Sequence, residues 1–141
     1  MLIMAAAVAD YRPAEMATQK IKKGQPVLDL HLERTIDILG SLAERQDLLR
    51  IGFAAETEHL VEAARDKVQR KKLDLIVAND AVATIGAEET EITLIDRQGE
   101  ARTLPRMHKA KAAQALIESL LELFPERLSA RRSTSEDHQT Q

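Results

Sequence analysis

Charged residues that could help to form a ligand site stand at three places in the chain. Asp10 follows an apolar run, the Lys-Ile-Lys-Lys stretch at 20–23 carries three cations, and Lys67 and Lys71 are four residues apart. On a helix, the i, i+4 spacing puts both ammonium groups on one face, where they can hold the same anion. These residues predict a binding site for an anionic ligand.

A purely structural role is the alternative at each place. The lysines at 20–23 could form a solvated basic turn, and an aspartate after a strand often caps a turn. Lys67 and Lys71 stand near the end of an expected helix, where the helix dipole favours cations. Charge and spacing alone therefore leave both readings open.

Strand and helix patterns alternate along the chain and must position these residues. Apolar runs and alternating residues predict strands, and apolar stripes with a period near 3.6 predict helices. The expected strands are 2–9, 27–32 (half-buried), 48–55 and 73–80; the helices are 37–46, 58–72 and 109–124; a hairpin joins 91–96 to 101–104.

This order predicts an α/β fold, with parallel strands and helices on both faces of the sheet. In such sheets ligands bind beyond the carboxyl ends of the strands. Three of the expected strands end in Ala9-Asp10, in Phe53-Ala54-Ala55-Glu56 and in Ala78-Asn79-Asp80. The sequence therefore places the candidate site at this edge.

Composition excludes several other classes of protein. A chain of 141 residues with a net charge of -3 is too acidic for a general nucleic-acid surface. It has no cysteine and no apolar run long enough for a membrane span, which fits a cytoplasmic protein without a membrane partner. No Gly-x-Gly-x-x-Gly pattern is present, so a Rossmann-type oxidoreductase is disfavoured. We expect one domain over 1–124 and a polar, disordered tail over 125–141.

Four motifs in order add a more specific signal. Together they resemble the phosphopantothenoylcysteine synthetase family, the second activity of the bifunctional coenzyme A biosynthesis flavoprotein of bacteria, over residues 2–122. The motifs are AAVADYRP at 6–13, KIKK at 20–23, GFAAET at 52–57 and KLDLIVAND at 72–80.

The resemblance implies a Rossmann-like three-layer sandwich with a mostly parallel sheet and a C-terminal hairpin. It also implies that the first βαβ portion of the family domain, with its glycine-rich phosphate loop, is lacking here. Members of the family activate the carboxylate of 4′-phosphopantothenate with CTP and Mg²⁺, giving an acyl-cytidylate and pyrophosphate. The amine of cysteine then displaces CMP and forms an amide. Members are homodimers, and the flavin belongs to a decarboxylase domain, so we expect no flavin in this chain.

The family's functional residues carry over to positions that match its motifs. Lys20 would stabilise the activation step at the phosphates, and Lys67 and Lys71 would hold the nucleotide. Ile36 stands where the family usually has proline, so that turn is expected to be less rigid. Metal ligands stay unassigned. The implied nucleotide-binding set is Met4, Ala5, Ala6, Asp10, Lys20, Ile36, Asp37, Ile38, Leu39, Phe53, Lys67 and Lys71.

The main alternative is a chain that binds a nucleotide or forms a dimer but lacks catalysis. It rests on the expected loss of the family's upstream phosphate loop and of its asparagine-containing segment. The two hypotheses share the fold and differ in whether pyrophosphate is released.

Overall fold

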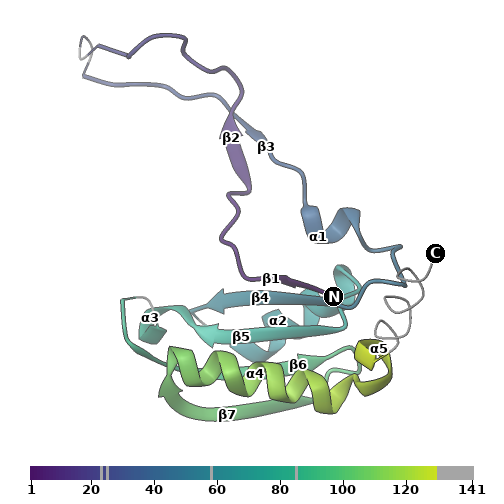
Figure 1. Ribbon diagram of the computed structural model, residues 1–141. Coiled ribbons are helices and arrows are strands. Elements are labelled where there is room, and N and C mark those ends of the chain that lie inside the picture. The colour runs from purple at the N-terminus through teal and green to yellow at the C-terminus, as the bar shows by residue number, and fades with distance from the viewer. Residues whose placement is uncertain (23, 25, 58, 85, 130–141) are drawn as a thin grey trace, which may run out of the picture.

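A five-stranded sheet forms the body of the protein in the computed structural model, which describes residues 1–129 except 23, 25, 58 and 85. The strand order is β1-β4-β5-β6-β7 (Figure 1). β1, β4 and β5 are parallel, and β6 and β7 continue the sheet as an antiparallel hairpin. The strands are β1 (Leu2–Met4), β4 (Arg50–Glu56), β5 (Leu75–Asp80), β6 (Glu89–Asp96) and β7 (Ala101–His108).

Helices cover both faces of this sheet, which gives the expected three-layer α/β sandwich. α2 (Leu60–Arg70) and α1 (Ile38–Ser41) lie on one face, and α4 (Lys109–Leu123) lies on the other. The sequence of β5 is continuously apolar because both faces of the strand are buried. Leu75 and Val77 pack toward α4, and Ile76 and Ala78 pack toward α2. A strand buried on both faces has no solvent side on which polar residues could alternate.

Two glycines stand where the backbone geometry of this fold favours a residue without a side chain. Gly52 lies in β4, where a Cβ would come within 2.7 Å of Leu73 Cδ1, so a side chain there would force the buried Leu73 to shift. Gly99 has φ +87° in the β6–β7 turn, at the position where the sequence predicted a hairpin. Glycine reaches such φ values without steric cost.

An arm projects from the body between β1 and α1 (Figure 1). Its base is a two-stranded antiparallel ribbon of β2 (Tyr11–Pro13) and β3 (Leu32–Arg34), and its outer part is the connection over 14–31. Thr35 fastens the base, because its Oγ1 donates to Ala9 O at 2.6 Å and its N donates to Asp10 O at 3.0 Å.

Several expected boundaries are wrong, mainly in the arm, just after it and at the chain ends. The helix expected over 37–46 is only the four residues of α1, and the chain continues from Leu42 as turns. The first strand ends at Met4, opposite Gly52 of β4, because the chain then leaves the sheet to enter the arm. The expected half-buried strand at 27–32 is not formed; only Leu32–Arg34 is a strand there, and it is exposed. Residues 125–129, expected in the disordered tail, form helix α5 (Pro125–Ser129), while 130–141 lie outside the described residues. The remaining described helix is α3 (Ala81–Thr84), directly after β5.

None of the helices in the described part of the chain is long and apolar enough to cross a membrane.

Candidate functional site

A pocket of about 390 Å³ lies at the carboxyl ends of β1, β4 and β5; we call it the C-terminal-edge pocket. This volume is within the usual range of small-molecule sites. Residues from several separate segments of the chain line this pocket. Its lining comprises Met4, Ala5, Ala6, Ala7, Val8, Asp10, Thr35, Ile36, Asp37, Ile38, Leu39, Phe53, Ala55, Lys67, Lys71 and Asn79.

Residues that follow the short strand β1 supply one wall of the pocket. Beyond Met4 the chain runs through small residues before it enters the arm at Tyr11. Alanines at 5–7 let a ligand approach the backbone closely, since no long side chain stands in the way. The early end of β1 therefore creates the opening of the pocket.

Lys67 and Lys71 face this pocket from α2, as their spacing predicted. Lys67 Nζ donates to Phe53 O at 3.2 Å, and the described residues give it no carboxylate partner. Lys71 Nζ pairs with Asp37 Oδ1 at 3.0 Å, and its side chain is only 21% exposed. One cation is thus free of a counter-charge and the other is held by one aspartate.

Asp37 joins the base of the arm to α2. Its Oδ1 also accepts from Gly40 N at 3.0 Å, which caps the first turn of α1. The hydrogen bond from Gly40, and then the ammonium of Lys71, hold the pKa of Asp37 below its ordinary value. Gly40 is required for this arrangement, because a Cβ there would lie 2.8 Å from Asp37 Oδ2.

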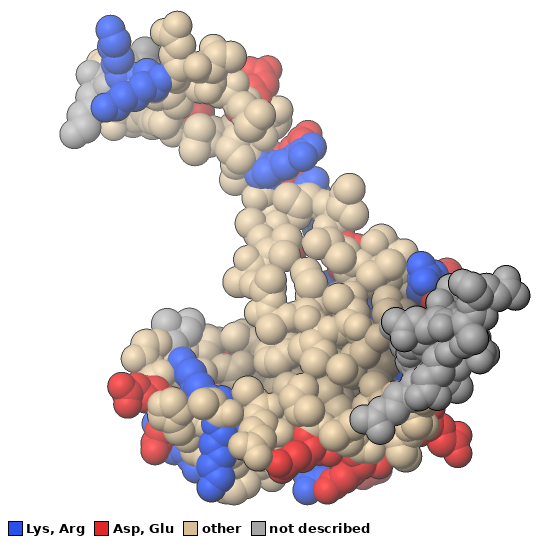
Figure 2. All heavy atoms as spheres, in the orientation of Figure 1, with Lys and Arg blue, Asp and Glu red and all other residues tan. Residues whose placement is uncertain are grey.

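The pocket gathers eleven of the twelve residues assigned from the sequence, and Lys20 is the exception. Lys20 and Lys22 are exposed in the arm, outside this lining, and Lys23 lies outside the described residues. Figure 2 shows cationic side chains at the outer end of the arm, away from the body. Within one subunit, therefore, Lys20 and Lys22 do not reach the site.

Sequence reasoning missed Ala7, Val8 and Thr35, and it did not assign Ala55 or Asn79 to the nucleotide set. The signal for Asn79 was present, because it follows a buried strand at the predicted edge. Thr35 gave no comparable signal, since its bond to Ala9 joins residues 26 positions apart.

Metal ligation has little support from protein side chains. Among the described residues, no three His, Cys, Asp or Glu side chains are grouped so that they could hold a metal ion. Asp80 is at the same edge, but its Oδ1 accepts from Val82 N and Ala83 N and so caps α3.

Comparisons with known proteins place this arrangement in a family. Residues 1–123 match the model for DFP, the DNA/pantothenate metabolism flavoprotein C-terminal domain. The coenzyme A biosynthesis bifunctional protein CoaBC of Bacillus subtilis (strain 168) is 38% identical over 126 residues, which cover 86% of this chain and 31% of that protein. The CoaBC of Thermococcus kodakarensis (strain ATCC BAA-918 / JCM 12380 / KOD1) is 41% identical over 124 residues, which cover 84% of this chain and 30% of that protein.

A solved structure agrees with the sequence relatives. The crystal structure of the C-terminal domain of the coenzyme A biosynthesis bifunctional protein CoaBC superposes with a TM-score of 0.67 at 34% identity. The match covers 88% of this chain and 54% of that one, and the chain spans about a third of the length of the curated relatives. This confirms the fold and the family inferred from the motifs: the chain belongs to the DFP family of flavoprotein C-terminal domains.

Proposed function

We propose that the C-terminal-edge pocket binds CTP and that the chain acts in the phosphopantothenate–cysteine ligase step of coenzyme A biosynthesis. The observation that carries this proposal is the convergence of five separate segments on one pocket with two lysines. Names of the relatives support the pathway, because both are coenzyme A biosynthesis proteins. In the proposed reaction, the carboxylate of 4′-phosphopantothenate attacks the α-phosphate of CTP and pyrophosphate leaves. The amine of cysteine then attacks the acyl-cytidylate, and CMP leaves as the amide forms.

The two lysines of α2 would bind the triphosphate. Lys67 lacks a carboxylate partner among the described residues, so a phosphate oxygen gives its ammonium a counter-charge. Lys71 would exchange Asp37 for the triphosphate, which carries more charge than a single carboxylate. Mg²⁺ would arrive with CTP and be held mainly by phosphate oxygens, given how few carboxylates are grouped in the described pocket.

The cytosine and ribose would lie between Phe53 and the turn before α1. Phe53 is half-buried at the pocket wall, and residues 36–39 line the same pocket. Backbone groups that pair with the base edge select it strongly, because a wrong base leaves a buried polar group unpaired. Asp10 and the backbone at 4–6 would complete the wall.

Lys20 reaches this chemistry only if it comes from a second copy of the chain. Large apolar side chains of the arm are half exposed or more: Tyr11, Met16, Ile21, Val27, Leu28, Leu30 and Leu32. Patches of this kind mark contact surfaces, and an isolated two-stranded ribbon is marginal on its own. We therefore propose a homodimer in which the arm covers the other subunit and Lys20 of the partner subunit completes the site.

The alternative is a nucleotide-binding or dimerisation module without ligase activity. It is favoured by the position of Lys20 outside the pocket. A nucleotide-binding module would bind CTP as the ligase does, whereas a dimerisation module would not, and neither would release pyrophosphate.

Calorimetric titration with CTP and Mg²⁺ tests the binding site. Lys67→Gln and Lys71→Gln should each raise the Kd for CTP by about tenfold or more, since each removes a charge-assisted bond to phosphate. Arg102→Gln is the matched control, because Arg102 is an exposed cation paired with Glu122 outside the pocket. Unchanged CTP affinity in the Lys67→Gln/Lys71→Gln double variant would refute the proposed binding site.

A further inference from the structure

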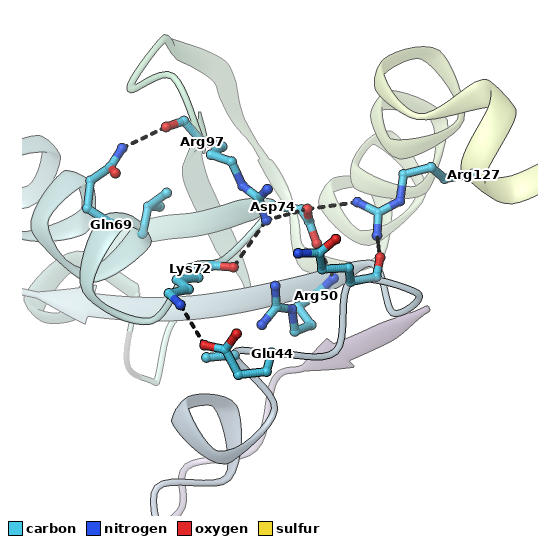
Figure 3. A pocket seen from close by; sticks show the side chains of 10 residues that line it. Glu44, Arg50, Gln69, Lys72, Asp74, Arg97 and Arg127 are labelled. Carbon is cyan, nitrogen blue, oxygen red and sulfur yellow. Dashed lines mark hydrogen bonds and ion pairs between the residues drawn. The ribbon is translucent and has the colours of Figure 1, made fainter.

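A second cavity lies at the opposite end of the parallel strands, where β4 and β5 begin; we call it the N-terminal-edge pocket. Its volume is about 420 Å³, and Figure 3 shows the labelled side chains around it. They come from the α1–β4 connection, the start of β4, the end of α2, the α2–β5 connection, the β6–β7 turn and α5. The lining residues are Ala43, Glu44, Gln46, Arg50, Val68, Gln69, Lys72, Asp74, Arg97 and Arg127.

Asp74 organises the arginines of this pocket. Its side chain is 5% exposed, and its Oδ2 accepts from Arg50 N at 2.8 Å. Its Oδ1 accepts from Arg97 Nη2 at 2.9 Å and from Arg127 Nη1 at 2.7 Å. One carboxylate therefore faces two guanidinium groups, and cationic charge is left over.

Arg50 adds a guanidinium that has no carboxylate at all among the described residues. The residue is only 2% exposed, and its Nη1 donates to Leu42 O at 2.7 Å. Its Nε is buried without an acceptor in the described part of the chain. Burying a charged donor without an acceptor is costly, and native structures nearly always supply one.

The other carboxylate of this pocket does not fill that need. Glu44 lines the same pocket, but its side chain is 83% exposed, and Oε1 is engaged by Lys72 Nζ at 2.6 Å. The pocket thus holds four cationic side chains against two carboxylates whose charges are already engaged.

We propose that the N-terminal-edge pocket binds a small phosphate-bearing anion through Arg50, Arg97 and Arg127. Guanidinium groups match phosphate because their planar forks donate two parallel hydrogen bonds. The anion supplies the charge that Asp74 alone does not balance, and a reorientation of the Arg50 side chain would let its buried Nε donate to the anion. This site lies at the other end of the sheet from the C-terminal-edge pocket, shares no lining residue with it and does not depend on the proposed ligase function.

Pyrophosphate is a suitable probe, and the test uses the full chain carrying Lys67→Gln and Lys71→Gln. These substitutions remove the lysines of the C-terminal-edge pocket, so the remaining binding reports the second pocket. Titration at constant ionic strength should show saturable binding. Adding Arg127→Gln or Arg50→Met should weaken it by about tenfold, and adding Arg102→Gln should not. If Arg102→Gln and Arg127→Gln weakened pyrophosphate binding equally, binding would depend only on the overall charge of the protein, and the proposal would be overturned.

Nuclear magnetic resonance gives a readout that survives if Arg50→Met does not fold. The Nε–H resonance of Arg50 in the otherwise unsubstituted chain should shift with pyrophosphate and saturate at the Kd from calorimetry. Sodium chloride at matched ionic strength should not move it. An Arg50 resonance that pyrophosphate leaves in place, or no saturable binding in the lysine double variant, would show an ordered water or an adventitious ion only and refute the site.

Discussion

The sheet body and the arm are built from similar residues but differ in what those residues contact. Ile51, Ile76 and Ile95 of the body are fully buried between the sheet and its helices. In the arm, Val27, Leu28 and their apolar neighbours face solvent, although their sequence is as apolar as that of a strand. Each apolar side chain moved from water into a core contributes about 1.5–3 kcal/mol. The body therefore holds itself together, whereas the arm lacks a covering surface within this subunit.

This difference separates two functional roles. The C-terminal-edge pocket is set in the body, where buried strands fix its walls, while Lys20 is carried by the exposed arm. A rigid pocket suits recognition of one ligand, and an arm suits contact with a second subunit. The proposed site joins the two regions, and paired substitutions can measure each of them.

The largest effect on stability is expected when one leucine in each region is replaced by alanine. Leu75→Ala in β5 removes a side chain that is 1% exposed, so the free energy of unfolding should fall by about 2–5 kcal/mol. Leu28→Ala in the arm removes a side chain that is 61% exposed, and it should change the free energy of unfolding by less than about 0.5 kcal/mol. Urea unfolding of both variants measures the contrast at concentrations below dimer formation.

Sedimentation of the same two variants sharpens this result. Leu28→Ala should weaken the homodimer, and Leu75→Ala should leave dimerisation of the folded protein unchanged. An arm variant that lowers stability as much as the body variant would mean that the arm is part of the core.

An intermediate effect is expected for carboxylates in ion pairs. Asp74→Asn removes the charge that Arg97 and Arg127 share, and it should cost about 2 kcal/mol of unfolding free energy because charge-assisted bonds of a buried group are lost. Glu33→Gln in the arm breaks the exposed pair with Arg12, which lies at 2.7 Å, and should cost at most about 1 kcal/mol. Thermal unfolding of the two variants at equal pH measures both costs. Equal losses of stability would contradict the difference between the buried pair of the body and the exposed pair of the arm.

The smallest effect is a pH dependence at Asp37, where the arm returns to the body. Because its pKa in the folded state is below the ordinary value, its contribution to stability is fully present above about pH 4 and is lost as pH falls through the folded pKa. Asp37→Asn lacks this contribution at every pH. The stability difference between the parent and Asp37→Asn should therefore shrink on acidification. A difference that stays constant from about pH 6 to about pH 3 would show that the cap and the Lys71 pair contribute nothing.

Sequence patterns located most elements of the body because burial on a sheet leaves a readable signal. The strand pattern at 73–80, the helix at 58–72 and the turn at Gly99 agree with β5, α2 and the β6–β7 hairpin. In the arm, the same reasoning predicted a strand that is not formed. Leu28, Leu30 and Leu32 alternate as in a half-buried strand, yet alternation indicates a strand only where a core lies on one side.

The candidate site was predictable in its segments but not in its contacts. Motif resemblance named residues that meet in one pocket, whereas the bond between Lys71 and Asp37 joins positions 34 apart and follows only from the fold. The N-terminal-edge pocket was not predicted at all. Its signal was present, because Arg50 and Asp74 each interrupt an apolar run at the start of a strand. A charge in such a place indicates a buried partner or a ligand.

Pyrophosphate release from CTP, Mg²⁺, 4′-phosphopantothenate and cysteine tests the central claim most directly, when two inactive variants are mixed. We predict that the parent is active and that Lys20→Gln and Lys67→Gln are each reduced by about a hundredfold. Their equal mixture should recover about a quarter of the parent rate, since about half of the dimers then contain one complete site. A parent that releases no pyrophosphate, or variants that do not complement each other, would contradict a ligase site completed by the arm of a second subunit.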